Sequence, residues 1–134
     1  MNKTFTILLF FFSCFITKTA SAQGGKSPVE DVVWAFKNNK IQEFTRNFDT
    51  YVPVSINNNA SNYSRNQAEI VVKDFFEKNP VRDFNVMDTG TPTNNNRSMI
   101  ATFSSSSGSR YTLYLLLKMK DNGYLVREVR ISKE

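Results

Sequence analysis

Residues 111–132 are YTLYLLLKMKDNGYLVREVRIS, in which apolar and polar side chains alternate on both sides of a short turn. Alternation with a period of two is typical of a strand with one buried face. Asp121-Asn122-Gly123 is a hairpin signal, because these residue types tolerate the backbone angles of tight turns. The pattern predicts two antiparallel strands, at 111–119 and 124–132. The expected inward residues are Tyr111, Leu113, Leu115, Leu117 and Met119 on the first strand, and Leu125, Val129 and Ile131 on the second.

Two further strands are predicted before this hairpin, because the same period continues towards the N-terminus. Phe84 and Val86 share one face of a strand at 83–89. A strand at 98–104 points Met99, Ala101 and Phe103 inward. Loops rich in turn-forming residues separate the strands. The C-terminal half is therefore expected to be a meander of about four antiparallel strands.

Residues 64–78 carry the clearest helix pattern of the chain. Ser64 is followed three residues later by Gln67, which is the spacing of a capping box. Pro80 ends the helix, because the residue before a proline is pushed out of the helical region. The apolar face at helical spacing consists of Ala68, Val71, Val72, Phe75 and Phe76.

Two helical segments and one strand precede this helix. A capping box at 27–30 opens the first segment, and a shorter apolar stripe at 41–48 forms the second. Residues 50–56 alternate like a half-buried strand. Pro53 predicts that this strand lies at a sheet edge, because proline cannot donate a ladder hydrogen bond. Residues 57–62 are expected to form a polar loop.

The order helix, helix, strand, helix and then a meander predicts the α+β class, with a curved antiparallel sheet packed against about three N-terminal helices. Across nearly all of residues 27–132, this order resembles the nuclear transport factor 2-like (cystatin-like) fold. The resemblance implies a strongly curved sheet that wraps against three helices and leaves a conical cavity. In enzymes of this fold, Asp, Tyr or His in the cavity act as acid and base.

A closer resemblance rests on three stretches of sequence. They resemble a family of short, exported proteins from Bacteroidota. The stretches are Tyr63-Ser64-Arg65-Asn66-Gln67-Ala68-Glu69, then Asp74-Phe75-Phe76 with Asn79-Pro80, and finally Val126-Arg127-Glu128-Val129-Arg130-Ile131 with Lys133-Glu134. They resemble the family called domain of unknown function 4783, within the nuclear transport factor 2-like superfamily. This resemblance implies the fold and an exported protein, and it brings no known activity.

The first 22 residues have the pattern of a cleavable signal peptide. Lys3 precedes an apolar run at 7–16, and an A-x-A cleavage site ends at Ala22. The run is shorter than the roughly 20 residues of a transmembrane helix. A single domain at 23–134, exported to the periplasm or beyond it, is therefore expected. A lipid anchor at Cys14 is the less favoured alternative, because the apolar run continues past it.

The composition excludes several chemistries. The chain has no histidine, and its one cysteine lies within the expected signal peptide. It therefore lacks the usual general base and, once cleaved, a thiolate nucleophile. The net charge of +5 becomes +3 when the signal and its two lysines are removed. A small, dispersed surplus does not indicate nucleic-acid binding, and neither a metal nor another cofactor is expected.

Arg127 and Tyr111 are the first two candidate ligand-binding residues. Arg127 lies between Leu125 and Val129 on the expected inward register, and a buried arginine must be paired or open to a cavity. It would bind an anion at the cavity floor. Alternatively, it reaches past the sheet edge into water, or a β-bulge reverses its register. Tyr111 either offers its hydroxyl to the same cavity or is a core residue with a polar tip.

Asp88 is the third candidate, as a cavity acid, because it falls in register with Phe84 and Val86. The alternative places it at the strand end in water, since aspartate is rarely buried unpaired. Trp34 lies beside the main apolar stripe of the first helix. It either extends the core or forms a partly exposed contact for a partner chain.

Three hypotheses for function follow. The leading one is a non-enzymatic binding module for a small apolar or anionic ligand, or for another chain. The second is a small isomerase-like enzyme that uses a carboxylate and a tyrosine. The third is a structural homodimer through the sheet face, because Tyr114 and Leu116 put apolar side chains on the outer register of the long strand at 111–119.

Overall fold

The structure is a computed structural model, and it describes residues 27–134. The expected signal peptide, its cleavage site at Ala22 and Cys14 lie outside the described residues. No helix within 27–134 is long and apolar enough to cross a membrane. The elements are α1 (Pro28–Lys37), α2 (Ile41–Thr45), β1 (Tyr51–Ile56), β2 (Asn59–Ser64), α3 (Arg65–Lys78), β3 (Val81–Thr89), β4 (Asn96–Ser105), β5 (Arg110–Lys120) and β6 (Gly123–Lys133).

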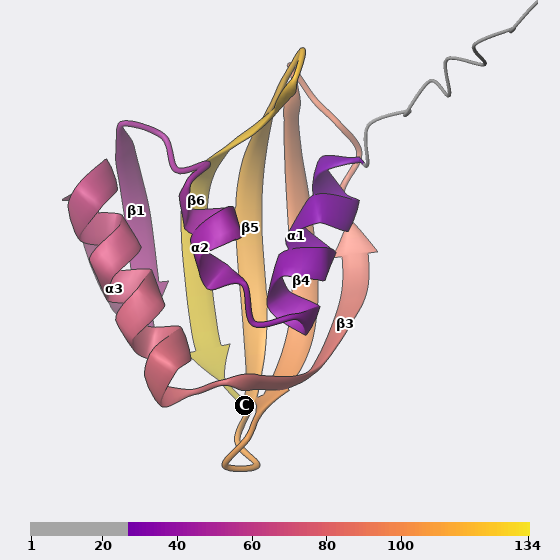
Figure 1. Ribbon diagram of the computed structural model, residues 1–134. Helices are drawn as coiled ribbons and strands as arrows, with labels where there is room; N and C mark the ends of the chain where they lie inside the picture. Colours follow the sequence, from indigo (N-terminus) through magenta and orange to yellow (C-terminus); the bar gives the residue numbers. More distant parts are fainter. Residues whose placement is uncertain (1–26) are drawn as a thin grey trace, which may run out of the picture.

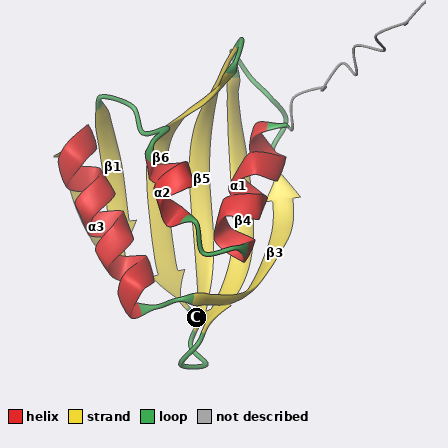
Figure 2. Ribbon diagram, viewed as in Figure 1, coloured by secondary structure: helices red, strands yellow, loops and turns green. Residues whose placement is uncertain are grey.

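The strands form one curved sheet in the order β2-β1-β6-β5-β4-β3. All neighbours are antiparallel except β1 and β6, which are parallel. The three helices lie over the same face of the sheet (Figures 1 and 2). The predicted α+β architecture, with its C-terminal meander of β3 to β6, is confirmed.

The two predicted capping boxes have different outcomes. At α1, the Ser27 hydroxyl accepts from the Glu30 amide at 3.2 Å, and the Glu30 carboxylate accepts from the Ser27 amide at 3.1 Å. At α3, the Ser64 hydroxyl instead donates to the Gln67 side chain, so no box forms. Ser64 is also the last residue of β2, and the ladder continues as the Arg65 amide donates to the carbonyl of Thr50.

The predictions for 50–62 were partly wrong. The strand β1 is internal, and the edge strand is β2, which replaces the expected polar loop. Asn57 and Asn58, with φ of 50° and 71°, form the two-residue turn between them. Positive φ at both central residues is the requirement of a type I′ hairpin turn. Pro53 is tolerated inside the sheet because the pairing of β1 with β6 begins one residue later, at Val54.

Aromatic rings fill the space between the helices and the sheet, where the resemblance implied a cavity. The ring of Phe36 on α1 lies at the centre of this cluster. Its centroid is 4.9 Å from that of Phe44, 5.2 Å from that of Phe76 and 5.0 Å from that of Phe84. Contacts of this geometry contribute beyond the burial of area alone. Among the described residues, the fold is therefore held by a packed interior between α1, α2, α3 and the sheet.

Candidate functional site

Arg127 is not inward, and the prediction of its register was wrong. Leu116 pairs with Glu128 and Leu117 with Val126, so Arg127 is the extra residue of a β-bulge in β6. The bulge exchanges the two faces of the strand. Before it the buried residues are Tyr124 and Val126, after it they are Val129 and Ile131, and Leu125 is only half-buried.

The Arg127 guanidinium lies near the surface and faces a carboxylate. Its Nε is 3.8 Å from Oδ2 of Asp49, and its side chain is 45% exposed. An exposed pair of this kind contributes little to stability. The anion-binding role of Arg127 stays a prediction. The residue lies near the surface and not on a cavity floor, where it was expected.

Tyr111 is buried on the predicted face of β5. Its hydroxyl donates to Oδ1 of Asn79 at 3.2 Å, and its ring stacks on Phe103 with centroids 5.1 Å apart. Asn79 follows the last residue of α3, so this hydrogen bond ties the end of the helix to the sheet. The contacts match the core alternative, and the ligand-binding role stays a prediction.

Asp88 lies on the outer face of the sheet, so its expected inward register was wrong. A second bulge shifts the register of β3 between Val86 and Asp88, and Asp88 then pairs with Ile100, whose side chain is exposed. The three candidates are therefore not brought together. Asp88 is on the edge strand, Arg127 is at the bulge of β6, and Tyr111 is in the core.

A surface hollow of about 360 Å³ lies where α1, α2 and the turn between β5 and β6 meet. We call it the hairpin hollow, and Figure 1 shows α1 and α2 on the helix side of the sheet, with the turn between β5 and β6 projecting at the top. Trp34 is 44% exposed, which matches the exposed alternative for this residue. The hollow is lined by Asp31, Trp34, Glu43, Asn47, Asn122, Gly123 and Tyr124.

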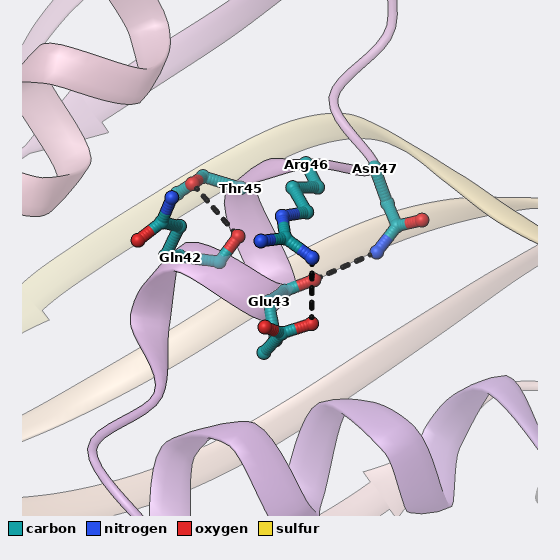
Figure 3. A network of polar contacts seen from close by, with 5 residues as sticks. All are labelled: Gln42, Glu43, Thr45, Arg46 and Asn47. Carbon is teal, nitrogen blue, oxygen red and sulfur yellow. Dashed lines mark hydrogen bonds and ion pairs between the residues drawn. The ribbon is translucent and has the colours of Figure 1, made fainter.

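A local polar network fixes the α2 side of the hollow (Figure 3). The Asn47 amide donates to the Glu43 carbonyl at 2.9 Å, and the Arg46 guanidinium lies 3.3 Å from the Glu43 carboxylate. The backbone carbonyl of Asn47 also accepts from the Val126 amide on β6. These contacts hold the short helix against the sheet. The segment that carries Glu43 and Asn47 is therefore fixed beside the hollow.

Tyr124 forms the buried wall of the hollow, and its ionisation is perturbed. Burial, followed by the negative charge of Asp31, raises the pKa of Tyr124 to about 12. A hydrogen bond with the Asn47 side chain acts in the opposite direction. The hydroxyl therefore stays neutral over ordinary pH, as a hydrogen-bonding group in a negative environment. No group of three or more His, Cys, Asp or Glu within 27–134 is arranged to hold a metal ion.

The outer face of the sheet carries a second candidate surface. Ile100, Tyr114 and Leu116 lie side by side on β4 and β5, because Ile100 pairs with Tyr114 and Leu116 is two residues further along the strand. We call these three residues the sheet patch. Ile100 is 36% exposed, and the other two are half-buried. The Arg130 guanidinium lies 4.9 Å from the centroid of the Tyr114 ring, a cation–π contact.

A curved mixed sheet with three helices over one face defines the nuclear transport factor 2-like class. A nuclear transport factor 2-like protein of unknown function from Shewanella baltica shares this fold, with a TM-score of 0.59 and 12% identity over 80% of this chain and 88% of that one. Residues 29–132 match the model of the family described as domain of unknown function (DUF4783), and the chain belongs to this family.

Solved members of the family agree with this assignment. A DUF4783 protein from Bacteroides fragilis superposes with a TM-score of 0.69 at 30% identity, over 78% of this chain and 96% of that chain. One from Bacteroides uniformis gives 0.70 at 24% identity, over 78% and 95%. No curated protein matches the chain. The predicted family and the predicted fold are both confirmed.

Proposed function

We propose that this protein is a non-enzymatic binding module whose contact surface is the outer face of its sheet, and that the partner is a second copy of the chain. The observation that carries this proposal is the sheet patch. Within residues 27–134, all three helices lie over the opposite face (Figure 2), so no helix covers these apolar side chains. An apolar centre with a charged rim is the usual anatomy of a protein interface.

Charge complementarity supports a second copy as the partner. One row of residues crosses four neighbouring strands on the outer face. It consists of Asp88, Ile100, Tyr114 and Arg130, each of which is the cross-strand partner of the next. A two-fold axis that runs along the strands between β4 and β5 would place Ile100 of one copy opposite Tyr114 of the other. The same axis would bring Asp88 opposite Arg130 at both ends of the row. Such self-complementarity is what an isologous dimer requires.

The dimensions of the sheet also suit this partner. Strands β4, β5 and β6 have 10, 11 and 11 residues. Strand β3 adds nine residues. With about 3.3 Å per residue and about 4.8 Å between strands, the four strands that the row crosses have a flat footprint of roughly 650 Å². A standard interface buries about 800 Å² on each partner.

Catalysis has weaker support. The version of the enzyme hypothesis that uses Asp88 needs this residue in a cavity beside a tyrosine, and Asp88 lies on the outer face. Asp31 and Tyr124 both line the hairpin hollow, and the charge of Asp31 raises the pKa of Tyr124. However, a pKa of Tyr124 near 12 is far from the range in which a general acid or base works efficiently. This pair is better suited to binding than to proton transfer.

Sedimentation equilibrium on the chain from Gln23 onward tests the proposal. We expect a dimer with a dissociation constant of roughly 1–100 μM. Leu116→Asp puts a charge at the centre of the patch and is expected to leave a monomer. Ile70→Asp is the matched control, because Ile70 is 67% exposed on α3, away from the outer face. A wild-type protein that stays monomeric at about 500 μM would contradict the proposal.

A further inference from the structure

Arg130 is held by two neighbours on the outer face of the sheet. Its Nε donates to Oε1 of Glu128, and its guanidinium lies 4.9 Å from the centroid of the Tyr114 ring. Glu128 and Arg130 are two residues apart on β6, so their side chains point to the same face. The carboxylate and the ring together restrict the position of the guanidinium in the free chain.

The bulge in β6 brings this pair to the outer face. After the bulge, Glu128 pairs with Leu116 of the sheet patch. Without it, the regular register from the hairpin would pair Glu128 with the fully buried Leu115. The extra residue of the strand therefore puts both Glu128 and Arg130 on the proposed contact surface.

The contact with Glu128 leaves most donors of Arg130 unused. Its Nη1 and Nη2 make no hydrogen bond or ion pair with any of residues 27–134. Asp88 likewise forms no ion pair with the described part of the chain. Both residues can therefore still form charge-assisted hydrogen bonds, and the proposed dimer places them opposite each other.

Glu128 has no opposite charge of its own to meet across the two-fold axis. Its row continues through Leu116 to Ser98 on β4 and ends beside Gly90, whose amide donates to the Ser98 carbonyl. An axis between β4 and β5 would place Glu128 of one copy opposite Gly90 of the other. Any contribution of Glu128 to the contact is therefore expected to act through Arg130.

Two effects of Glu128 on dimerisation oppose each other. Its charge partly cancels that of Arg130, which weakens the attraction to Asp88. Its hydrogen bond fixes a long side chain in advance, so that less rotamer freedom is lost on association. The Arg130 side chain is 57% exposed, and water and salt screen the first effect but not the second. The ordering of Arg130 is therefore expected to be the larger effect.

We propose that Glu128 is a positioning residue for the dimer contact, which orders Arg130 so that its Nη atoms meet Asp88 of the second copy. This inference rests on the proposed dimer through the outer face. It adds that the charged end of the contact is pre-formed in the free chain.

Sedimentation equilibrium on two variants of Glu128 tests this role. Glu128→Ala removes the acceptor, and we expect the dissociation constant of the dimer to rise about threefold. Glu128→Gln keeps an acceptor oxygen without the charge, so its dissociation constant should stay within about 1.5-fold of the wild-type value. Glu43→Ala is the matched control and should have no effect, because it removes the carboxylate of an exposed arginine pair on the helix side.

The same substitution in an Arg130→Gln background separates positioning from a general effect on β6. If Glu128 acts through Arg130, Glu128→Ala should leave the weaker dimer of that background unchanged. Damage to the strand would instead weaken the dimer in both backgrounds. Thermal unfolding of each variant checks that the fold is retained.

Three results would overturn the proposal. One is a tighter dimer in Glu128→Ala, which would make Glu128 a competitor for Arg130. Another is an unchanged dissociation constant in Glu128→Ala, and the third is an equal loss in the Arg130→Gln background. These results would remove only the role of Glu128, whereas a monomeric wild-type protein would remove the proposed dimer and this inference with it.

Discussion

Tyr124 gives the residue-scale test of the hairpin hollow. Burial and Asp31 raise its pKa from 10.0 to about 12 in the folded protein. Between pH 10 and 12, the unfolded chain therefore loses this proton while the folded chain keeps it. The free energy of unfolding must then fall as the pH rises through this range, because the folded state binds more protons. Below about pH 9 the residue contributes no pH dependence.

The comparison with Tyr124→Phe isolates this effect, because both proteins share their other ionisable groups. We expect urea unfolding to show a constant stability difference below pH 9. The advantage of the wild type should then shrink steadily from pH 10 to 12. Parallel curves over the whole range would show that Tyr124 has the same pKa in the folded protein as in the unfolded chain, which would contradict this effect.

Single residues also show which features could not be predicted from the sequence. The alternation in 124–132 correctly indicated a strand, yet it placed Arg127 and Leu125 on the wrong face. One extra residue in β6 exchanges the faces, and a bulge has no composition that distinguishes it from a regular strand. The burial of Tyr111 could be predicted because β5 alternates without interruption from residue 111 to 117. Its hydrogen bond to Asn79 could not, because the two residues meet only through the packing of α3 on the sheet.

At the scale of elements, a substitution in the turn between β1 and β2 tests whether residues 59–64 form the edge strand. Asn58 has a φ of 71°, a region that glycine adopts with less strain than asparagine. Asn58→Gly is therefore expected to stabilise the protein by about 0.5 kcal/mol, because relief of the left-handed backbone outweighs the extra freedom that glycine has in the unfolded chain. The shift of the urea midpoint at constant slope would measure this gain.

The same substitution within the strand should have the opposite sign. Asn62 pairs with Pro53 in the middle of β2, where glycine loses more conformational freedom on folding. Asn62→Gly is expected to cost about 0.5–1 kcal/mol. Equal effects of the two substitutions would mean that 57–62 behaves as the polar loop that its sequence suggested.

Elements with strong local signals were the ones that the sequence predicted well. The helix at 64–78 and the four C-terminal strands fall within about two residues of their expected bounds. The strand β2 was missed because its residues, NASNYS, carry no apolar alternation. It forms because β1 offers a paired edge and Asn57-Asn58 closes the turn, so its cause is a partner strand and not its own propensity.

At the scale of the whole molecule, the sheet has two unlike faces. One packs under three helices (Figure 1) and contains the aromatic interior. The other carries the sheet patch. The order of elements was enough to predict this layering. The hairpin hollow was not predictable, because Asp31, Glu43 and Tyr124 are far apart in the sequence and converge only when α1 and α2 dock beside the hairpin. Export through residues 1–22 stays a prediction.

The most direct test of the central claim is a charge reversal across the proposed two-fold axis. Asp88→Arg alone and Arg130→Asp alone each oppose like charges at both ends of the row, and each should weaken dimerisation at least about tenfold. The double variant restores opposite charges, so we expect its dissociation constant, measured by sedimentation equilibrium, to return to within about threefold of the wild-type value. A double variant that associates no better than Arg130→Asp alone would contradict the account, because Asp88 and Arg130 of two copies could not then face one another.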